Sequence, residues 1–369
     1  MNHNAKKFNY LVMAFTFLLL GCMAIIIIII DPFFHYHAPI DGLAYAWGEE
    51  RYQNNGIVRH FEYDAIITGT SMSQNFKTSE MDKLFGTNAI KVTYSGGEYN
   101  EIDANLIVAL ESNRNIKMVL RGVDFNSLLH DKDTPLHDIA DKGYQYPWYM
   151  IDSNYLTDVS YIFNKSIFLQ SIDTGLAKGE LPSFDTYHYW GDSRKYGKKV
   201  VFESRKAGYY NEDKPISDVQ RRLNDNETEL MLGNIDQNII QTIESYPDVE
   251  FYLFIPPYSI CFWDSYGRGG NINVAIDAMC LLTKKLVQYD NVKLFAFWNN
   301  YEMITNLDNY RDIYHYGPNV NSKILHWMAE EDEKYLLTKD NYQEYWNEIR
   351  NFYSNYDYDS IFEEEVDEN

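Results

Sequence analysis

The chain has 369 residues, 45% of them hydrophobic, and its excess of acidic over basic side chains gives a formal net charge of −22. An aromatic fraction of 16% supplies enough surface for a folded core. The negative charge would repel phosphate backbones and anionic lipid headgroups, which argues against nucleic acid as a partner and against a basic membrane-surface mode. With three cysteines, the composition also excludes a disulfide scaffold and a cysteine-based zinc site.

An uncharged apolar run covers residues 10–30 and ends in six consecutive isoleucines. At about 1.5 Å per residue, a helix of this length crosses the roughly 30 Å hydrocarbon core of a bilayer. Lys6 and Lys7 precede the run and Asp31 follows it, so the positive-inside rule predicts a cytoplasmic N-terminus, residues 1–9. We therefore expect a single-pass signal anchor in the cell membrane, with the rest of the chain outside the cytoplasm.

Two other interpretations of the apolar run stay open. A cleaved signal peptide usually has a shorter apolar region that ends in small residues rather than in isoleucines. Leu19-Leu20-Gly21-Cys22 resembles a bacterial lipobox, although a mature lipoprotein normally continues into polar sequence. Since Cys22 lies within the run, Cys261 and Cys280 are the one pair that could form a disulfide outside the membrane.

After a membrane-proximal segment, residues 31–60, short apolar runs alternate with helical patterns, which is typical of an α/β domain with a mainly parallel sheet. The predicted strands are residues 65–68, 89–93, 117–120, 249–255 and 292–296, and the predicted helices are residues 98–112, 216–246, 271–287 and 318–328. Residues 128–215 break this alternation and predict an insertion at the carboxyl edge of the sheet. Its aromatic side chains could stack on sugar rings or pack the insertion against the domain. Residues 336–369 predict a C-terminal helix and an acidic tail.

The first predicted strand ends in Gly69-Thr70-Ser71-Met72-Ser73, which places Ser71 at the carboxyl end of a sheet strand. Open α/β sheets position reacting groups at that edge, where backbone N–H groups can stabilise an oxyanion. Gly-x-Ser is also common in ordinary strand-to-helix turns, so a partner base is needed to make it a nucleophile candidate.

A candidate base occurs just after the last predicted strand, in Asp312-Ile313-Tyr314-His315. A serine nucleophile needs an imidazole to accept its proton, and the imidazole needs a carboxylate to fix its tautomer and stabilise its positive charge. An aspartate three residues before the histidine can do this from one loop. The combination predicts a Ser71–His315–Asp312 triad.

The order of these motifs over residues 63–328 resembles that of the SGNH (GDSL-like) hydrolase superfamily. The resemblance implies a three-layer α/β/α sandwich of the flavodoxin-like type over residues 61–335, with Ser71 as nucleophile and Asp312 and His315 as the last block. Tyr94-Ser95-Gly96-Gly97 resembles the glycine block, so the N–H groups of Ser71 and Gly96 would face the oxyanion. No metal or other cofactor is implied.

Two positions depart from the superfamily pattern. Thr70 stands where many members have aspartate, and Gly122-Val123-Asp124-Phe125-Asn126 replaces the usual Gly-x-Asn-Asp block. Either Asp124 or Asn126 could fill the third-block position. We favour Asn126 as the third oxyanion-hole residue, because its amide can donate a hydrogen bond whereas an ionised Asp124 cannot. A loop cap is the competing role for Asn126.

Within the superfamily, the N-terminal anchor and the late Asp-x-x-His-x-Gly are similar to those of membrane-anchored proteins of cell-surface polymer modification, the D-alanyl transfer (DltD-like) and alginate O-acetylation proteins. That resemblance implies an esterase or O-acyltransferase acting on a surface polysaccharide or teichoic acid, with a membrane-bound O-acyltransferase as partner. The alternative is a non-catalytic glycan-binding or assembly subunit with the same fold, which would fit the altered third block and the aromatic insertion.

Overall fold

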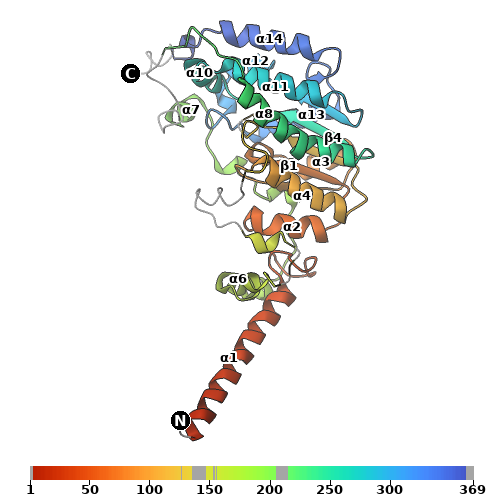
Figure 1. Ribbon diagram of the computed structural model, residues 1–369, viewed down its shortest axis with the longest axis vertical. Helices are drawn as coiled ribbons and strands as arrows, with labels where there is room; N and C mark the ends of the chain where they lie inside the picture. Colours follow the sequence, from red (N-terminus) through yellow and green to blue (C-terminus); the bar gives the residue numbers. More distant parts are fainter. Residues whose placement is uncertain are drawn as a thin grey trace.

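The computed structural model describes residues 3–125, 127–134, 147–152, 154, 156–204 and 215–362, which form a long N-terminal helix and an α/β domain beyond it (Figure 1). The strands are β1 (Ala65–Gly69), β2 (Ala89–Thr93), β3 (Met118–Gly122), β4 (Glu250–Ile255), β5 (Val292–Ala296) and β6 (Leu336–Leu337). The helices are α1 (His3–Ile30), α2 (Glu50–His60), α3 (Thr78–Phe85), α4 (Tyr99–Ser112), α5 (Val159–Ile162), α6 (Lys165–Leu176), α7 (Lys198–Ser204), α8 (Asp225–Ile235), α9 (Gln241–Ser245), α10 (Ile260–Arg268), α11 (Ile272–Leu286), α12 (Tyr301–Thr305), α13 (Pro318–Ala329) and α14 (Tyr342–Asn355).

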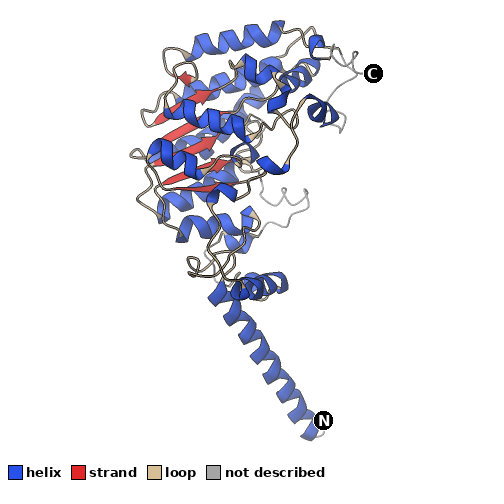
Figure 2. Cartoon of the chain, turned by 180° about the vertical axis from the view of Figure 1, so that it is seen from behind, coloured by secondary structure: helices blue, strands red, loops and turns tan. Residues whose placement is uncertain are grey.

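The strands form one sheet in the order β2-β1-β3-β4-β5-β6, parallel except for β6, which pairs antiparallel with β5. Every residue of β1, β2 and β3 is buried, as expected for strands that are covered on both faces. The order reverses after β2, so right-handed crossovers place α3 on one face and α4, α8, α9 and α11 on the other, and α13 packs beside α3. Figure 2 shows helices on both sides of the sheet. The predicted α/β/α architecture with a mainly parallel sheet is therefore confirmed.

The described residues also correct two sequence predictions. The helix predicted over residues 216–246 begins only at Asp225, where Asn224 and Glu227 form a capping box. It then passes through a π-helical segment, Asp236–Ile240, into α9. The edge strand β6 was not predicted, because two residues are too short to produce a periodic pattern.

The N-terminal helix α1 has the length and composition of a membrane-crossing helix. Its apolar stretch, Asn4–Ile30, is almost entirely exposed in the described structure, and Figure 1 shows α1 projecting away from the α/β domain. Among the described residues it is the one helix that passes this test. Its composition and its place near the N-terminus fit a membrane anchor or a signal sequence.

Aromatic side chains dominate the core between β5 and the C-terminal helices. Trp263 of α10 is fully buried, stacks on Tyr353 of α14 with ring centroids 3.8 Å apart, and meets Trp298 edge-on at 4.7 Å. Cys261, on the same helix, is also buried, and no disulfide joins it to Cys280.

Trp263→Ala is expected to lower the free energy of unfolding by about 3–5 kcal/mol, because the substitution leaves a cavity and removes the contacts with the Tyr353 and Trp298 rings. Trp263→Phe keeps a stacked ring and is expected to cost less, since the indole N–H of Trp263 has no hydrogen-bond partner to lose among the described residues. Urea unfolding of the full chain in detergent micelles, followed by circular dichroism, measures both. An alanine variant as stable as the wild type would contradict this packing.

Candidate active site

Ser71 lies immediately beyond β1, at the carboxyl edge of the sheet. Gly69 closes the strand with a φ of 128°, and a Cβ there would come within 2.6 Å of Ser73 Oγ, so the close turn requires glycine. Residues Ser71–Ser73 then form one turn of 3₁₀-helix, capped by Thr70, whose Oγ1 accepts a hydrogen bond from the Met72 N–H. This turn places Ser71 just beyond the carboxyl end of β1.

His315 and Asp312 lie in one loop beside Ser71, although His315 is 244 residues after Ser71 in the chain. Ser71 Oγ lies 2.8 Å from His315 Nε2, and His315 Nδ1 lies 2.8 Å from Asp312 Oδ2. Asp312 Oδ1 also accepts hydrogen bonds from the backbone N–H groups of Tyr314 and His315. A carboxylate can only accept, so the imidazole proton lies on Nδ1, and the Nε2 lone pair faces the serine hydroxyl. The structure thus brings the three predicted triad residues into one hydrogen-bonded chain.

The loop that carries this pair is fixed from both sides. Tyr310 and Tyr316 form an antiparallel bridge, and the Tyr310 hydroxyl donates to the Pro257 carbonyl. The Ser259 hydroxyl donates to the Ile313 carbonyl between them. The turn after β4 therefore holds the His315 loop in place beside the end of β1.

The carboxylate of Asp312 is suited to stay ionised. Burial opposes ionisation, but the hydrogen bonds from the His315 ring and from two backbone N–H groups outweigh it and lower the pKa of Asp312 below 3.8. Its contribution to stability is therefore present above pH 3.8 and is lost as the pH falls through the lowered pKa. The His315 and Asp312 side chains are 27% and 20% exposed, so a substrate can reach them.

Asp124 takes a structural position behind Ser71. Its carboxylate accepts hydrogen bonds from Thr70 Oγ1 at 2.6 Å and from the Tyr258 hydroxyl at 3.0 Å. Burial raises the pKa of this carboxyl. Thr70, which departs from the superfamily pattern, thus links the nucleophile turn to the ends of β3 and β4. Asn126, the favoured third-block residue, lies outside the described residues.

Gly96 lies in a tight turn after β2, the strand next to β1. Its φ of 59° is left-handed, and the Tyr94 N–H donates to the Gly69 carbonyl, so the turn adjoins the one that carries Ser71. The neighbouring helix α2 holds this turn through hydrogen bonds to the backbone N–H and the carbonyl of Ser95. The Glu50 carboxylate accepts the Ser95 N–H, and Arg51 donates to the Ser95 carbonyl. The described contacts thus place the predicted glycine block at the same edge as Ser71.

Glu50 makes the glycine-block turn sensitive to pH. Burial raises its pKa from 4.5 to about 7, although the Ser95 N–H and Arg51 partly offset this. A raised folded-state pKa means that its stabilisation is present below pH 4.5 and is lost as the pH rises through about 7. We expect the melting temperature of the wild type to fall more between pH 5 and 8 than that of Glu50→Gln. If the melting temperatures of the wild type and Glu50→Gln fell by the same amount over that range, the pKa of Glu50 would not be raised.

Two residues that the motifs did not indicate, Trp190 and Arg311, lie next to His315 or its neighbours. The Trp190 ring, from the insertion, meets the His315 ring edge-on with centroids 5.7 Å apart, and the Arg311 guanidinium lies 5.1 Å from the Trp190 ring centre. Elsewhere in the insertion, Tyr187 is fully buried and donates to Asn54 of α2. Tyr187 therefore packs the insertion onto the domain, and Trp190 lies next to the His315 ring. An isolated tryptophan carries no spacing signal, so this contact could not be predicted from the sequence.

Comparisons with known proteins add little to this geometry. No protein-family model matches the chain, and no curated protein is significantly similar to it. Among solved structures, the chain is similar to one described as a platelet activating factor from Streptococcus pneumonia, with 11% identity and a TM-score of 0.35 over 76% of this chain and 90% of that one. A match at that score bears on neither fold nor function.

Proposed function

We propose that the protein is a membrane-anchored serine esterase or O-acyltransferase of the SGNH type, with Ser71 as nucleophile. The observation that supports this most strongly is the continuous chain of hydrogen bonds from Ser71 Oγ through the His315 ring to Asp312. Ser71 and His315 are far apart in sequence, so their 2.8 Å contact requires the whole fold. When the unprotonated ring nitrogen of a histidine accepts a hydrogen bond from a serine hydroxyl, the histidine can take the serine proton and so activate the hydroxyl for attack.

The proposed reaction has two balanced halves. Ser71 Oγ attacks the ester carbonyl carbon while its proton moves to His315 Nε2, and Asp312 stabilises the resulting imidazolium. His315 then gives that proton to the leaving alcohol oxygen as the old ester bond breaks, which leaves an acyl ester on Ser71. In the second half an acceptor hydroxyl loses its proton to His315 and attacks the acyl group, and the proton returns to Ser71. The N–H groups of Ser71 and Gly96 are the proposed oxyanion donors.

The identity of the acceptor decides between the two activities. Water would make the protein an esterase, whereas a hydroxyl of a surface polysaccharide or teichoic acid would make it an O-acyltransferase. The apolar helix α1 favours transfer, because an anchor would hold the site close to an acyl donor presented at the membrane, for instance by a membrane-bound O-acyltransferase. The topology we propose places the N-terminus in the cytoplasm and the α/β domain outside it.

A non-catalytic glycan-binding subunit is the competing function. Such a subunit would not need a serine hydroxyl that is hydrogen-bonded to a histidine, nor a carboxylate that orients this histidine. The 2.8 Å contact of Ser71 with His315 therefore favours catalysis.

The proposal is tested with the full chain in detergent micelles or nanodiscs and a small activated acetyl ester. Ser73→Ala is a matched control, because Ser73 lies in the same 3₁₀ turn and its Oγ has no hydrogen-bond partner among the described residues. We expect turnover in the wild type and in Ser73→Ala, and none above background in Ser71→Ala. Turnover that survives in Ser71→Ala would overturn the proposed mechanism.

Transfer is tested separately in cells. A chromosomal Ser71→Ala strain is compared with a Ser73→Ala strain for the amount of ester on its surface polymers. A transferase predicts ester loss in the first strain alone, and an esterase predicts ester gain. Equal ester content in both strains would contradict action on a surface polymer.

A further inference from the structure

Large apolar side chains are exposed along the insertion where it runs beside the end of α1. They belong to α5, to α6 and to the residues that flank α5: Leu156, Val159, Phe163, Leu169 and Leu176. Leu156 and Leu176 are 81% and 77% exposed. A soluble surface rarely gathers side chains of this size on one short segment, so such a patch indicates a surface that is covered in the working protein.

This segment is packed onto the last turns of α1. Ile27 of α1 is fully buried in a small cluster with Met150, Tyr161 and Ile167 of the insertion. Further along α6, a Cβ at Gly175 would come within 3.2 Å of Ile30 Cδ1, so this glycine permits close approach of the two helices. Figure 1 shows α6 lying across the end of α1, below the α/β domain.

Polar contacts fix the same arrangement just beyond α1. The buried Tyr161 hydroxyl donates to Asp31 Oδ1 at 2.7 Å, and the Asp158 carboxylate contacts both His35 Nε2 and the Tyr36 hydroxyl at 3.0 Å. The side chain of His37 reaches back to the carbonyls of the last turn of α1. The first residues after α1 are thus bonded to α5, which holds the insertion at a fixed height along α1.

That height corresponds to a membrane interface. The helix from Phe8, just after the two lysines, to Ile30 rises roughly 34 Å at 1.5 Å per residue. A bilayer has a hydrocarbon core of about 30 Å and a total thickness of about 40–45 Å with its headgroups. If Lys6 and Lys7 lie at one interface, the end of α1 and the helix α6 that crosses it lie at the other.

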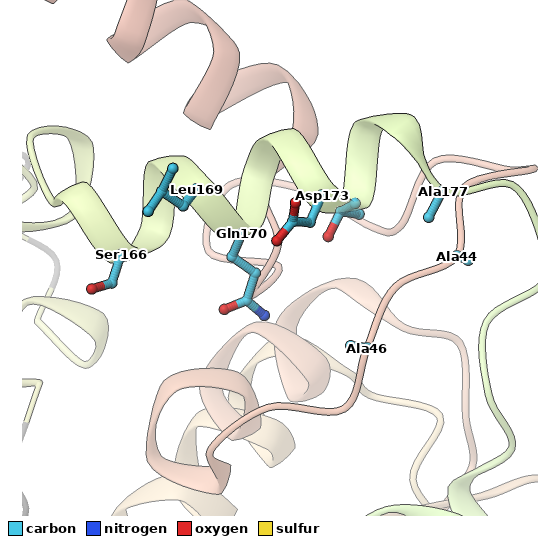
Figure 3. Close-up of a pocket in the computed structure, with 8 residues that line it drawn as sticks. Ala44, Ala46, Ser166, Leu169, Gln170, Asp173 and Ala177 are labelled. Carbon is cyan, nitrogen blue, oxygen red and sulfur yellow. The ribbon is translucent and has the colours of Figure 1, made fainter.

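One side of α6 lines a hollow of about 570 Å³ between the helix and the segment that carries Ala44 and Ala46, and Figure 3 shows Ser166, Leu169 and Gln170 among the residues that line it. Leu169 is nevertheless 49% exposed and Leu176 is 77% exposed. Because these two leucines are seven residues apart, they lie on the same side of α6. We assign that side to the membrane.

We propose that α5 and α6 form a second membrane contact, which lies in the headgroup and acyl-chain boundary of the leaflet that α1 leaves. The occupant of the exposed apolar patch is lipid, because the segment that carries the patch packs on the last turns of α1, where Ile25, Ile28 and Ile29 are exposed as well. Lys165 and Lys178, exposed at the two ends of α6, can extend their amines to lipid phosphates. The proposal rests on the proposed anchoring by α1, and it adds that the domain is held at two points and cannot swing freely about its anchor.

The test uses nitroxide spin labels on the full chain in phosphatidylcholine and phosphatidylglycerol vesicles. Labels are placed at Leu169→Cys and Leu176→Cys, in a background with Cys22→Ala and Cys280→Ser. Val219→Cys is the matched control, since Val219 is 75% exposed but lies outside the insertion helices. Phe17→Cys reports on α1. The ratio of accessibility to oxygen over accessibility to a water-soluble nickel chelate is expected to be several-fold higher at Leu169 and Leu176 than at Val219.

The outcomes separate the two proposals. High ratios at Phe17, Leu169 and Leu176 support the interfacial contact. A high ratio at Phe17 with water-like ratios at Leu169 and Leu176 would overturn it and leave the anchor intact. A water-like ratio at Phe17 would overturn the anchor itself. Labels at Leu169 and Leu176 that are shielded from both reagents would show a protein partner in place of lipid, which would also overturn the proposal.

Discussion

Ser71→Ala is expected to lower kcat for ester turnover by about 10⁶-fold, the scale seen when the nucleophile of a serine hydrolase triad is removed. The substitution deletes a single oxygen, the one that lies 2.8 Å from His315 Nε2. His315 and Asp312 keep their own contacts, so the loss reflects chemistry and leaves the fold in place. Stopped-flow or steady-state assays with an activated acetyl ester measure the change directly.

The control for this prediction removes a hydroxyl two residues away. Ser73 is buried and lies in the same 3₁₀ turn, but its Oγ has no hydrogen-bond partner among the described residues. We expect Ser73→Ala to retain turnover within a few-fold of the wild type. Equal losses in the two variants would mean that the turn as a whole, and not the Ser71 hydroxyl, is needed, and would contradict the assignment.

Asp312→Asn is expected to lower kcat by about 10⁴-fold while the fold is kept. An asparagine can still accept the backbone N–H groups of Tyr314 and His315 through Oδ1. Its amide N–H₂, however, would face His315 Nδ1 and donate to it, which moves the ring proton to Nε2. The imidazole would then present a donor to Ser71 and could no longer accept the serine proton.

Asp308→Asn serves as the comparison for this variant. Asp308 is an exposed carboxylate on the chain leading into the same loop, so its neutralisation changes the local charge without touching the imidazole. We expect turnover close to that of the wild type. If Asp308→Asn and Asp312→Asn lost activity to the same degree, the effect would come from charge in general, and the tautomer argument would fail.

Much of the fold could be predicted because the central strands are buried on both faces. Such strands read as short apolar runs, and the predicted ranges for β2 and β5 match the structure residue for residue. Helix α2 was harder to detect, because its buried side includes Glu50, Gln53 and Asn54, which leave no apolar stripe. The start of α8 could have been found from the capping pair Asn224 and Glu227, a local signal that the longer apolar pattern obscured.

The site was predictable to the extent that it depends on strand ends and short motifs. The contact between Asp312 and His315 could be predicted from the motif alone, because the two residues are close in sequence and share one loop. The supporting contacts were beyond the sequence, because they join distant segments: Thr70 to Asp124, and Trp190 to His315. Contacts between residues that are distant in the sequence leave no periodicity or spacing in the sequence from which they could be predicted.

The most direct test of the central claim is covalent labelling of the full chain with a fluorophosphonate, followed by mass mapping of the modified peptide. We expect one adduct on Ser71, none on Ser73, and a large fall in the labelling rate in His315→Ala. That outcome requires both the nucleophile and its base. An unmodified Ser71, or a Ser71 that is labelled as fast in His315→Ala as in the wild type, would contradict the claim that the imidazole activates this serine.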